Sequence, residues 1–96
     1  MNPEQLRIVE TVIEWAKSNH IDLTDTAFYT PEEWKARGEV HCTKSKLVMT
    51  YEGEINHVIN GYTDDPMNYA TLVATLDKLG YWFECGTSWY CGFYKN

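Results

Sequence analysis

Cysteine and histidine are the residue types in this chain that could support nucleophilic catalysis, with Cys42 and His57 as the candidate pair. A catalytic thiol needs a base within hydrogen-bond reach and a setting that favours the thiolate. If 47–51 and 55–59 form a hairpin and 40–43 adds a short strand, His57 falls on the far side of the central strand from Cys42. The two side chains would then lie about 10 Å apart. We therefore expect both residues in the core and predict no catalytic residue.

The same residue types are zinc ligands, and four of them could form a site: His41, Cys42, Cys85 and Cys91. Adjacent residues on a strand point to opposite faces, so His41 and Cys42 converge poorly on one ion. We predict no metal site and no cofactor.

The three cysteines are an odd number, so they cannot all pair with one another. In a C-terminal hairpin with a three-residue loop, Cys85 and Cys91 are diagonal neighbours about 7 to 8 Å apart. A five-residue loop would place them directly opposite. We expect free thiols.

Paired carboxylates lie in predicted turns and caps. General acid and base catalysis needs two carboxyl groups in unequal environments, and water equalises them at such positions. Four acidic residues could instead gather at one end of the sheet: Glu52, Glu54, Asp64 and Asp65. Such an acidic patch would suit a mimic of nucleic acid, which presents carboxylates where a partner expects phosphates.

The elements that position these residues begin at clear helix signals. Asn2-Pro3 with Gln5 predicts a capped helix over 3–19 with one broad buried face. Its apolar stripe is centred on Leu6, Val9, Ile13 and Ala16 and is widened by Ile8, Val12 and Trp15. Thr30-Pro31-Glu32-Glu33 is a capping box for a short helix that stops near Gly38 and is pinned to the core by Trp34. Asp65-Pro66 begins a third helix, which runs to Gly80.

Strand patterns fall between and after these helices. Residues 47–51 and 55–59 alternate, and we predict a hairpin between them, although 55–59 also fits helical spacing. The aromatic segment 81–94 predicts a second hairpin turning at Gly86-Thr87-Ser88, with Tyr81 facing Phe93 and Trp82 facing Gly92.

The predicted fold is a single α+β domain over residues 1–96. It has an antiparallel sheet of four to five strands, two main helices and one short helix. The order is helix, short helix, two or three strands, helix, two strands, and the order of strands within the sheet stays open.

Charge and composition narrow the function. The 96 residues carry a net charge of −6, which repels a phosphate backbone and disfavours direct nucleic-acid binding. The start of the chain shows no basic region leading into an apolar core, and no apolar stretch approaches the length of a membrane span. We expect a soluble cytoplasmic protein without membrane attachment.

The outer face of the C-terminal hairpin is the strongest candidate site. It would carry Trp82, Tyr90 and Tyr94 with Glu84 as its one charge, an aromatic content typical of protein-binding hot spots. If helices covered both faces of the sheet, these residues would form a second core instead. A homodimer through the same face is a further alternative.

We therefore predict a small acidic, non-enzymatic protein-interaction module. Its size and charge are analogous to those of inhibitors and adaptors from phages or other mobile elements. The partner is an unknown protein. The alternative is a small-molecule-binding protein or minor enzyme, with a pocket between the third helix and the sheet lined by Met49, His57 and Tyr62.

Overall fold

Helices alternate with strands along the first half of the chain, and the strands come together in one sheet. The structure, a computed structural model, describes residues 1–61 and 66–96. The elements are α1 (Pro3–Ser18), β1 (Thr26–Tyr29), α2 (Pro31–Ala36), β2 (Leu47–Tyr51), α3 (Glu54–Ile59), α4 (Pro66–Leu79), β3 (Tyr81–Thr87) and β4 (Tyr90–Lys95). The sheet has the order β1-β2-β4-β3, and every pair is antiparallel. The predicted α+β class is confirmed.

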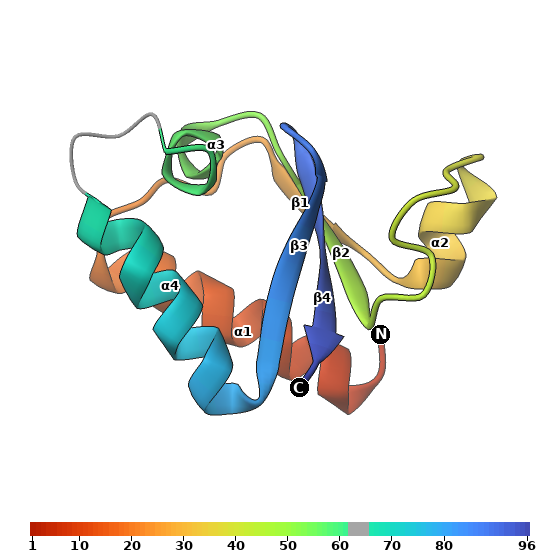
Figure 1. Ribbon diagram of the computed structural model, residues 1–96, viewed down its shortest axis with the longest axis horizontal. Coiled ribbons are helices and arrows are strands. Elements are labelled where there is room, and N and C mark those ends of the chain that lie inside the picture. Colours follow the sequence, from red (N-terminus) through yellow and green to blue (C-terminus); the bar gives the residue numbers. More distant parts are fainter. Residues whose placement is uncertain (62–65) are drawn as a thin grey trace.

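The sheet separates two unequal apolar layers. Helices α1, α3 and α4 lie on one side of it, which we call the inner face, and α2 lies on the other, the outer face (Figure 1). The main core fills the inner side and includes Ile8, Trp15, Leu72, Leu76 and Phe93. A smaller cluster on the outer side is built from Trp34, Val48 and Tyr90.

Helix α1 begins as its sequence predicts. The Asn2 side chain accepts from the Gln5 backbone N–H, and the Gln5 side chain accepts from the Asn2 backbone N–H. The buried stripe is rotated from the predicted one: it centres on Ile8 and Val12, whereas Leu6 is 47% exposed. The helix therefore buries one edge of its broad apolar face and leaves the other in water.

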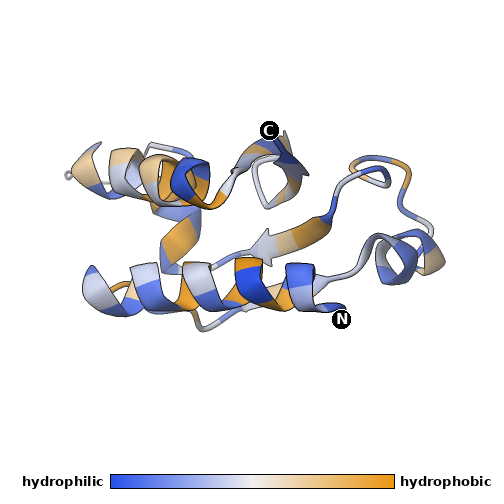
Figure 2. Cartoon of the chain, turned by 90° about the horizontal axis from the view of Figure 1, so that it is seen from below, coloured by the Kyte–Doolittle hydropathy of each residue, from blue (hydrophilic) through white to orange (hydrophobic). Residues whose placement is uncertain are grey.

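Helices α1 and α4 differ in how their apolar residues are used. Figure 2 shows α1 alternating between hydrophilic and hydrophobic segments, whereas α4 is pale to orange along most of its length. Of the apolar residues in α4, only Leu72 and Leu76 are fully buried, and Val73 is 40% exposed. Among the described residues, no helix combines the length and the apolarity needed to cross a bilayer.

The short helix α2 is also predicted correctly. Thr30 Oγ1 accepts from the Glu33 backbone N–H at 3.1 Å, and the Glu33 carboxylate accepts from the Thr30 N–H at 2.9 Å. The helix is followed by Gly38, whose φ of +89° suits glycine. Trp34 is fully buried, so it does pin the helix to the sheet.

The segment 55–59 is helical, so the predicted strand there is wrong. Its three apolar residues Ile55, Val58 and Ile59 are all buried on one side of α3. Strand β2 already has β1 on one side and β4 on the other, which leaves it no edge for a third strand. Asn56 Nδ2 holds the helix in place by donating to the Tyr51 and Ser88 carbonyls at 3.1 and 2.7 Å.

Two other strand assignments change. Residues 40–43 form no strand, because they belong to the loop that leads from α2 to β2. Strand β1 over Thr26–Tyr29 was not predicted. It is short and only partly buried, so it shows no alternation of buried and exposed residues, and its place comes from pairing with β2.

The C-terminal hairpin is confirmed, but its predicted register and turn are wrong. Phe83 faces Phe93 and Cys85 faces Cys91, because an irregularity between Cys85 and Thr87 moves the turn to residues 88–89. The change leaves each of these side chains on its predicted face, since a shift of two residues preserves alternation. Trp82 therefore faces Tyr94 instead of Gly92.

Candidate functional site

The outer face of the sheet is divided into two regions, which we call the covered half and the open half. The covered half is the cluster of Trp34, Val48 and Tyr90, against which Tyr29 and Trp89 pack. The Trp34 ring lies 5.0 Å from the Tyr90 ring and 5.6 Å from the Tyr29 ring, centroid to centroid. Helix α2 supplies the central side chain of this cluster.

Polar groups close the covered half. The Trp34 Nε1–H donates to the His41 carbonyl at 2.8 Å, which satisfies the buried indole. The Arg37 guanidinium lies 4.8 Å from the Tyr29 ring centroid and 5.0 Å from that of Trp34, so a cation–π contact forms the outer layer.

Two glycines let the chain approach closely in this region. A Cβ on Gly92 would lie 3.1 Å from Cys42 Cβ and 3.0 Å from Ser45 Cβ, so the loop after α2 rests directly on β4. A Cβ on Gly86 would lie 2.1 Å from Tyr90 Cε1. Tyr90 therefore packs over bare backbone at the hairpin irregularity.

The open half consists of Trp82, Glu84 and Tyr94. The rings of Trp82 and Tyr94 are stacked, with centroids 4.9 Å apart and planes 25° apart. Trp82 is nevertheless 44% exposed, and Glu84 is exposed beside it. Burial, followed by an interaction with the Cys42 thiol, raises the pKa of Tyr94 to about 12. Tyr94 thus stands at the border between the two halves.

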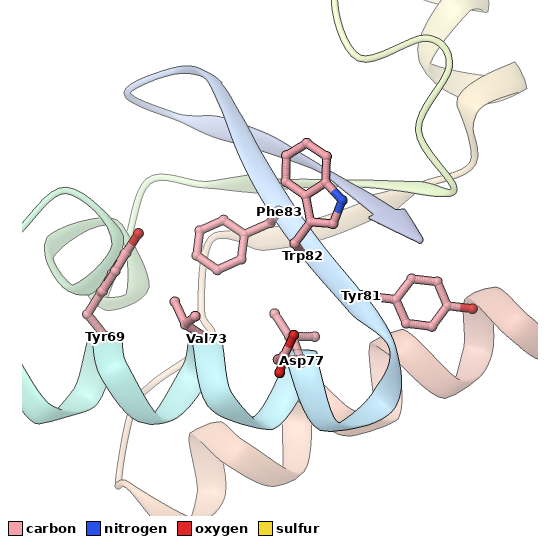
Figure 3. A pocket seen from close by; sticks show the side chains of 7 residues that line it. Tyr69, Val73, Asp77, Tyr81, Trp82 and Phe83 are labelled. Atoms are coloured by element: carbon pink, nitrogen blue, oxygen red, sulfur yellow. The ribbon is translucent and has the colours of Figure 1, made fainter. Parts of the chain in front are cut away.

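A pocket adjoins the open half at the free edge of β3, and we call it the edge pocket. Figure 3 shows Tyr69, Val73 and Asp77 rising from one side of α4 toward Phe83. Leu76, Tyr81 and Trp82 complete the lining of a cavity of about 160 Å³. The rings of Tyr69 and Phe83 meet edge to face at 6.0 Å. Tyr69 and Val73 are 42% and 40% exposed, so apolar surface continues from Trp82 onto α4.

Tyr90 does not belong to the exposed surface on which the sequence placed it. Only 3% of the residue is exposed, because α2 and the loop after it cover this end of the outer face. Burial raises its pKa. Both readings of the hairpin face thus apply, one to each half: Tyr90 is part of a second core, and Trp82 is at the surface.

The predicted pocket of Met49, His57 and Tyr62 is not assembled among the described residues. Met49 is buried in the main core and His57 is exposed on α3. Tyr62 lies outside the described residues. The edge pocket does adjoin the predicted third helix, but other side chains line it.

Half of the predicted acidic patch can be placed. Glu52 and Glu54 are both exposed, and the Glu54 carboxylate accepts from the Asp22 backbone N–H at 3.0 Å. The Glu52 N–H donates to the Asp25 carbonyl at 3.2 Å, so acidic residues from two loops meet at this end of β2. The remaining two positions, Asp64 and Asp65, lie outside the described residues.

The cysteine and histidine candidates are separated by the sheet. Cys42 packs against the outer cluster, whereas α3, which carries His57, packs in the main core. Burial raises the pKa of the Cys42 thiol, so this position does not favour a thiolate. Across residues 1–61 and 66–96, no group of three or more His, Cys, Asp or Glu side chains could hold a metal ion.

Cys85 and Cys91 lie directly opposite each other, the pairing of the five-residue-loop alternative, although the turn itself is at residues 88–89. Both are free thiols, as expected. Cys85 is exposed and Cys91 is buried. The Tyr51 hydroxyl donates to Cys85 Sγ at 3.5 Å, and burial raises the pKa of both Tyr51 and Cys91.

A second hollow opens between α1 and the paired ends of β3 and β4. It measures about 330 Å³, and its rim carries the charged residues Glu4, Arg7 and Lys95. The Tyr81 hydroxyl donates to the Glu4 carboxylate there. That hydrogen bond lowers the pKa of Glu4, and burial together with the bond raises the pKa of Tyr81 to about 12.

Tyr69 and Val73 are the surface residues that sequence reasoning missed. The signal was present, because 66–79 contains more apolar residues than one buried helix face can hold. Comparison with protein-family models, curated proteins and solved structures gives no match to this chain.

Proposed function

We propose that this chain is a non-enzymatic protein-interaction module, which binds a partner protein through the open half and the exposed side of α4. One observation carries the proposal: the Trp82 side chain is 44% exposed, is stacked on Tyr94, and lines the same pocket as the exposed side chains of Tyr69 and Val73. Large aromatic side chains that are fixed and exposed are the usual anchors of protein interfaces. Tyr90 is buried in the covered half and is not part of this surface.

The contrast within one sheet face supports the proposal. On the covered half the chain itself supplies a partner for the aromatic side chains, namely Trp34 of α2. On the open half nothing in the described residues plays that part for Trp82. A partner protein would bury the open half as α2 buries the covered half.

We also propose a cytoplasmic setting, in keeping with the odd number of cysteines.

Small-molecule binding is the second candidate function, and the hollow between Glu4, Arg7 and Lys95 favours it. Its volume of about 330 Å³ is at the lower end of the usual range of about 300 to 1,000 Å³ for ligand sites. Its charged rim suits a small polar compound. A rise in melting temperature with such a compound, abolished by Arg7→Ala, would support this function.

The main proposal is tested by capture with matched variants. The experiment immobilises wild type, Trp82→Ala and Leu6→Ala and incubates each with a cell lysate. Mass spectrometry identifies the proteins that each retains, and binding is then measured again with the purified partner. Leu6 is the control because it is an apolar side chain on α1 with a similar exposed fraction. We expect Trp82→Ala to weaken binding about tenfold or more, as for an interface anchor, and Leu6→Ala to leave it unchanged. Equal retention by all three proteins would contradict the proposal.

A further inference from the structure

Strand β3 lies at the edge of the sheet and has β4 as its one neighbour. An edge strand leaves a row of unpaired backbone donors and acceptors along its free edge, where another chain can pair with them. Within the described residues, the hydrogen bonds made by the backbone of Tyr81–Thr87 are those to β4. The backbone groups on the free edge of β3, the edge away from β4, therefore form no hydrogen bonds with another described element.

The phase of the ladder identifies which residues face outward. The Asn96 N–H donates to the Gly80 carbonyl at 2.9 Å, so this pair is hydrogen-bonded. In an antiparallel ladder hydrogen-bonded pairs alternate with non-bonded pairs, which assigns Trp82 and Glu84 to bonds with β4. The alternate residues point their N–H and C=O groups away from the sheet. These are Tyr81, Phe83 and Cys85.

The edge pocket lies beside the backbone groups of this free edge, on the inner face of the sheet. Phe83 lines the pocket together with Tyr69 and Val73 of α4 (Figure 3). A residue added opposite Phe83 would project its side chain to the same inner side, because paired residues share a face. The cavity of about 160 Å³ would receive one apolar side chain at that position.

The charges near the strand favour a basic partner. Glu84 is exposed on the outer face of the sheet. Asp77 lines the edge pocket, and its carboxylate accepts from Asn96 Nδ2 at 3.2 Å. Lys95 lies opposite Tyr81, at the start of β3, whereas Glu84 lies at its middle. A residue added opposite Glu84 would face the outer side, where a lysine or arginine complements the carboxylate.

We propose that β3 accepts an extended segment of another protein as an additional antiparallel strand. The segment places an apolar side chain in the edge pocket and a basic side chain beside Glu84, at adjacent positions. Such strand addition draws affinity from the backbone and specificity from alternate side chains. A second copy of this chain fits less well, since it adds another net charge of −6 and a second Glu84. The inference deepens the proposed function and rests on it.

The test uses a blocked peptide of about nine residues that alternates valine and lysine, a length that spans one strand. It is titrated into the isotope-labelled full chain, and amide hydrogen exchange is read by NMR. We expect exchange at Tyr81, Phe83 and Cys85 to slow about tenfold or more, since these amides gain partners. Replacing lysine by glutamate in the peptide should weaken binding about tenfold.

Methylated peptides provide the sharpest control. The residue opposite Phe83 is a valine whose own N–H points to β3, so methylating the valine nitrogens should abolish binding. Methylating the lysine nitrogens, which point away, should preserve it. Equal effects of the two methylated peptides would overturn strand addition.

The remaining outcomes also decide the matter. Binding that shifts the Trp82 side chain without slowing exchange at Phe83 would overturn the inference and leave the proposed function standing. If these amides became protected without peptide as the concentration of the chain increased, the occupant would be a second copy of the chain, and the proposal of another protein would be overturned. No response up to about 1 mM peptide, the weak end of specific binding, would also reject strand addition. Equal capture of partner proteins by wild type and Trp82→Ala would instead contradict the proposed function itself, because that experiment tests the exposed side chains and not the edge of β3.

Discussion

The covered and open halves of the outer sheet face are built from similar side chains but differ in burial. Trp34 fills the first and is fully buried, whereas Trp82 anchors the second and is 44% exposed. What separates them is the segment between β1 and β2, which folds back over one half with α2 and reaches as far as Gly92. Coverage by a local segment, and not aromatic content, decides whether a tryptophan stabilises the fold or remains available to a partner.

The largest expected effect comes from removing the tryptophan of the covered half. Trp34→Ala leaves a cavity among three aromatic rings and should lower the free energy of unfolding by about 3 to 5 kcal/mol. Trp82→Ala loses one stacked contact at the surface and should cost about 1 kcal/mol. Urea denaturation of both variants measures the difference. Similar losses in the two variants would erase the distinction between the halves.

A smaller effect should follow from adding one methyl group beneath Tyr90. In Gly86→Ala the new Cβ would sit within 2.1 Å of the Tyr90 ring, so the ring must move within a packed cluster. We expect a loss of about 1 to 3 kcal/mol by urea denaturation, the usual cost of overpacking. Ser88→Ala, an exposed change in the adjoining turn, is the control and should alter stability little. An unchanged Gly86→Ala variant would show that the covered half is loosely packed.

The smallest effect concerns Tyr94, at the border between the halves. Because its pKa is raised to about 12 in the folded state, its contribution is fully present below pH 10 and is lost as the pH rises through 12. Tyr94→Phe should therefore reduce the loss of stability between pH 8 and pH 11 by about 1 kcal/mol, measured by urea denaturation at both values. The same alkaline loss in wild type and variant would place Tyr94 in the open half alone.

Local sequence signals predicted the helix starts well. Asn2 and Thr30 each meet their reciprocal partner three residues later, and both capping boxes form as expected. The faces of most hairpin residues were also predictable, because alternation survives the two-residue change of register. Trp89 is an exception: we expect it on the core side opposite Cys85, but it lies in the turn and packs against the outer cluster. These features depend on neighbours in the chain, which the sequence displays directly.

The features that could not be predicted depend on distant neighbours. Residues 55–59 fit helical spacing as well as the strand alternation that we favour from the sequence. The outcome is decided by β4, which occupies the side of β2 that a hairpin partner would need. Strand β1 carries no alternation and exists through its pairing with β2. Tyr90 and Trp82 look alike in sequence, and only the path of the loop after α2 distinguishes them.

The central position of β2 also bears on how the chain folds. Strands β3 and β4 follow each other directly, whereas β2 meets β4 only after the chain has passed through α3 and α4. Closing a long loop costs more entropy than forming an adjacent hairpin, and non-local pairing slows folding. We expect the β3–β4 hairpin to form early and the docking of β2 to set the rate. If the hairpin forms first, the edge of β4 that later pairs with β2 is exposed until β2 docks. We therefore expect the isolated hairpin to present two unpaired strand edges, whereas in the native sheet it retains one, the free edge of β3.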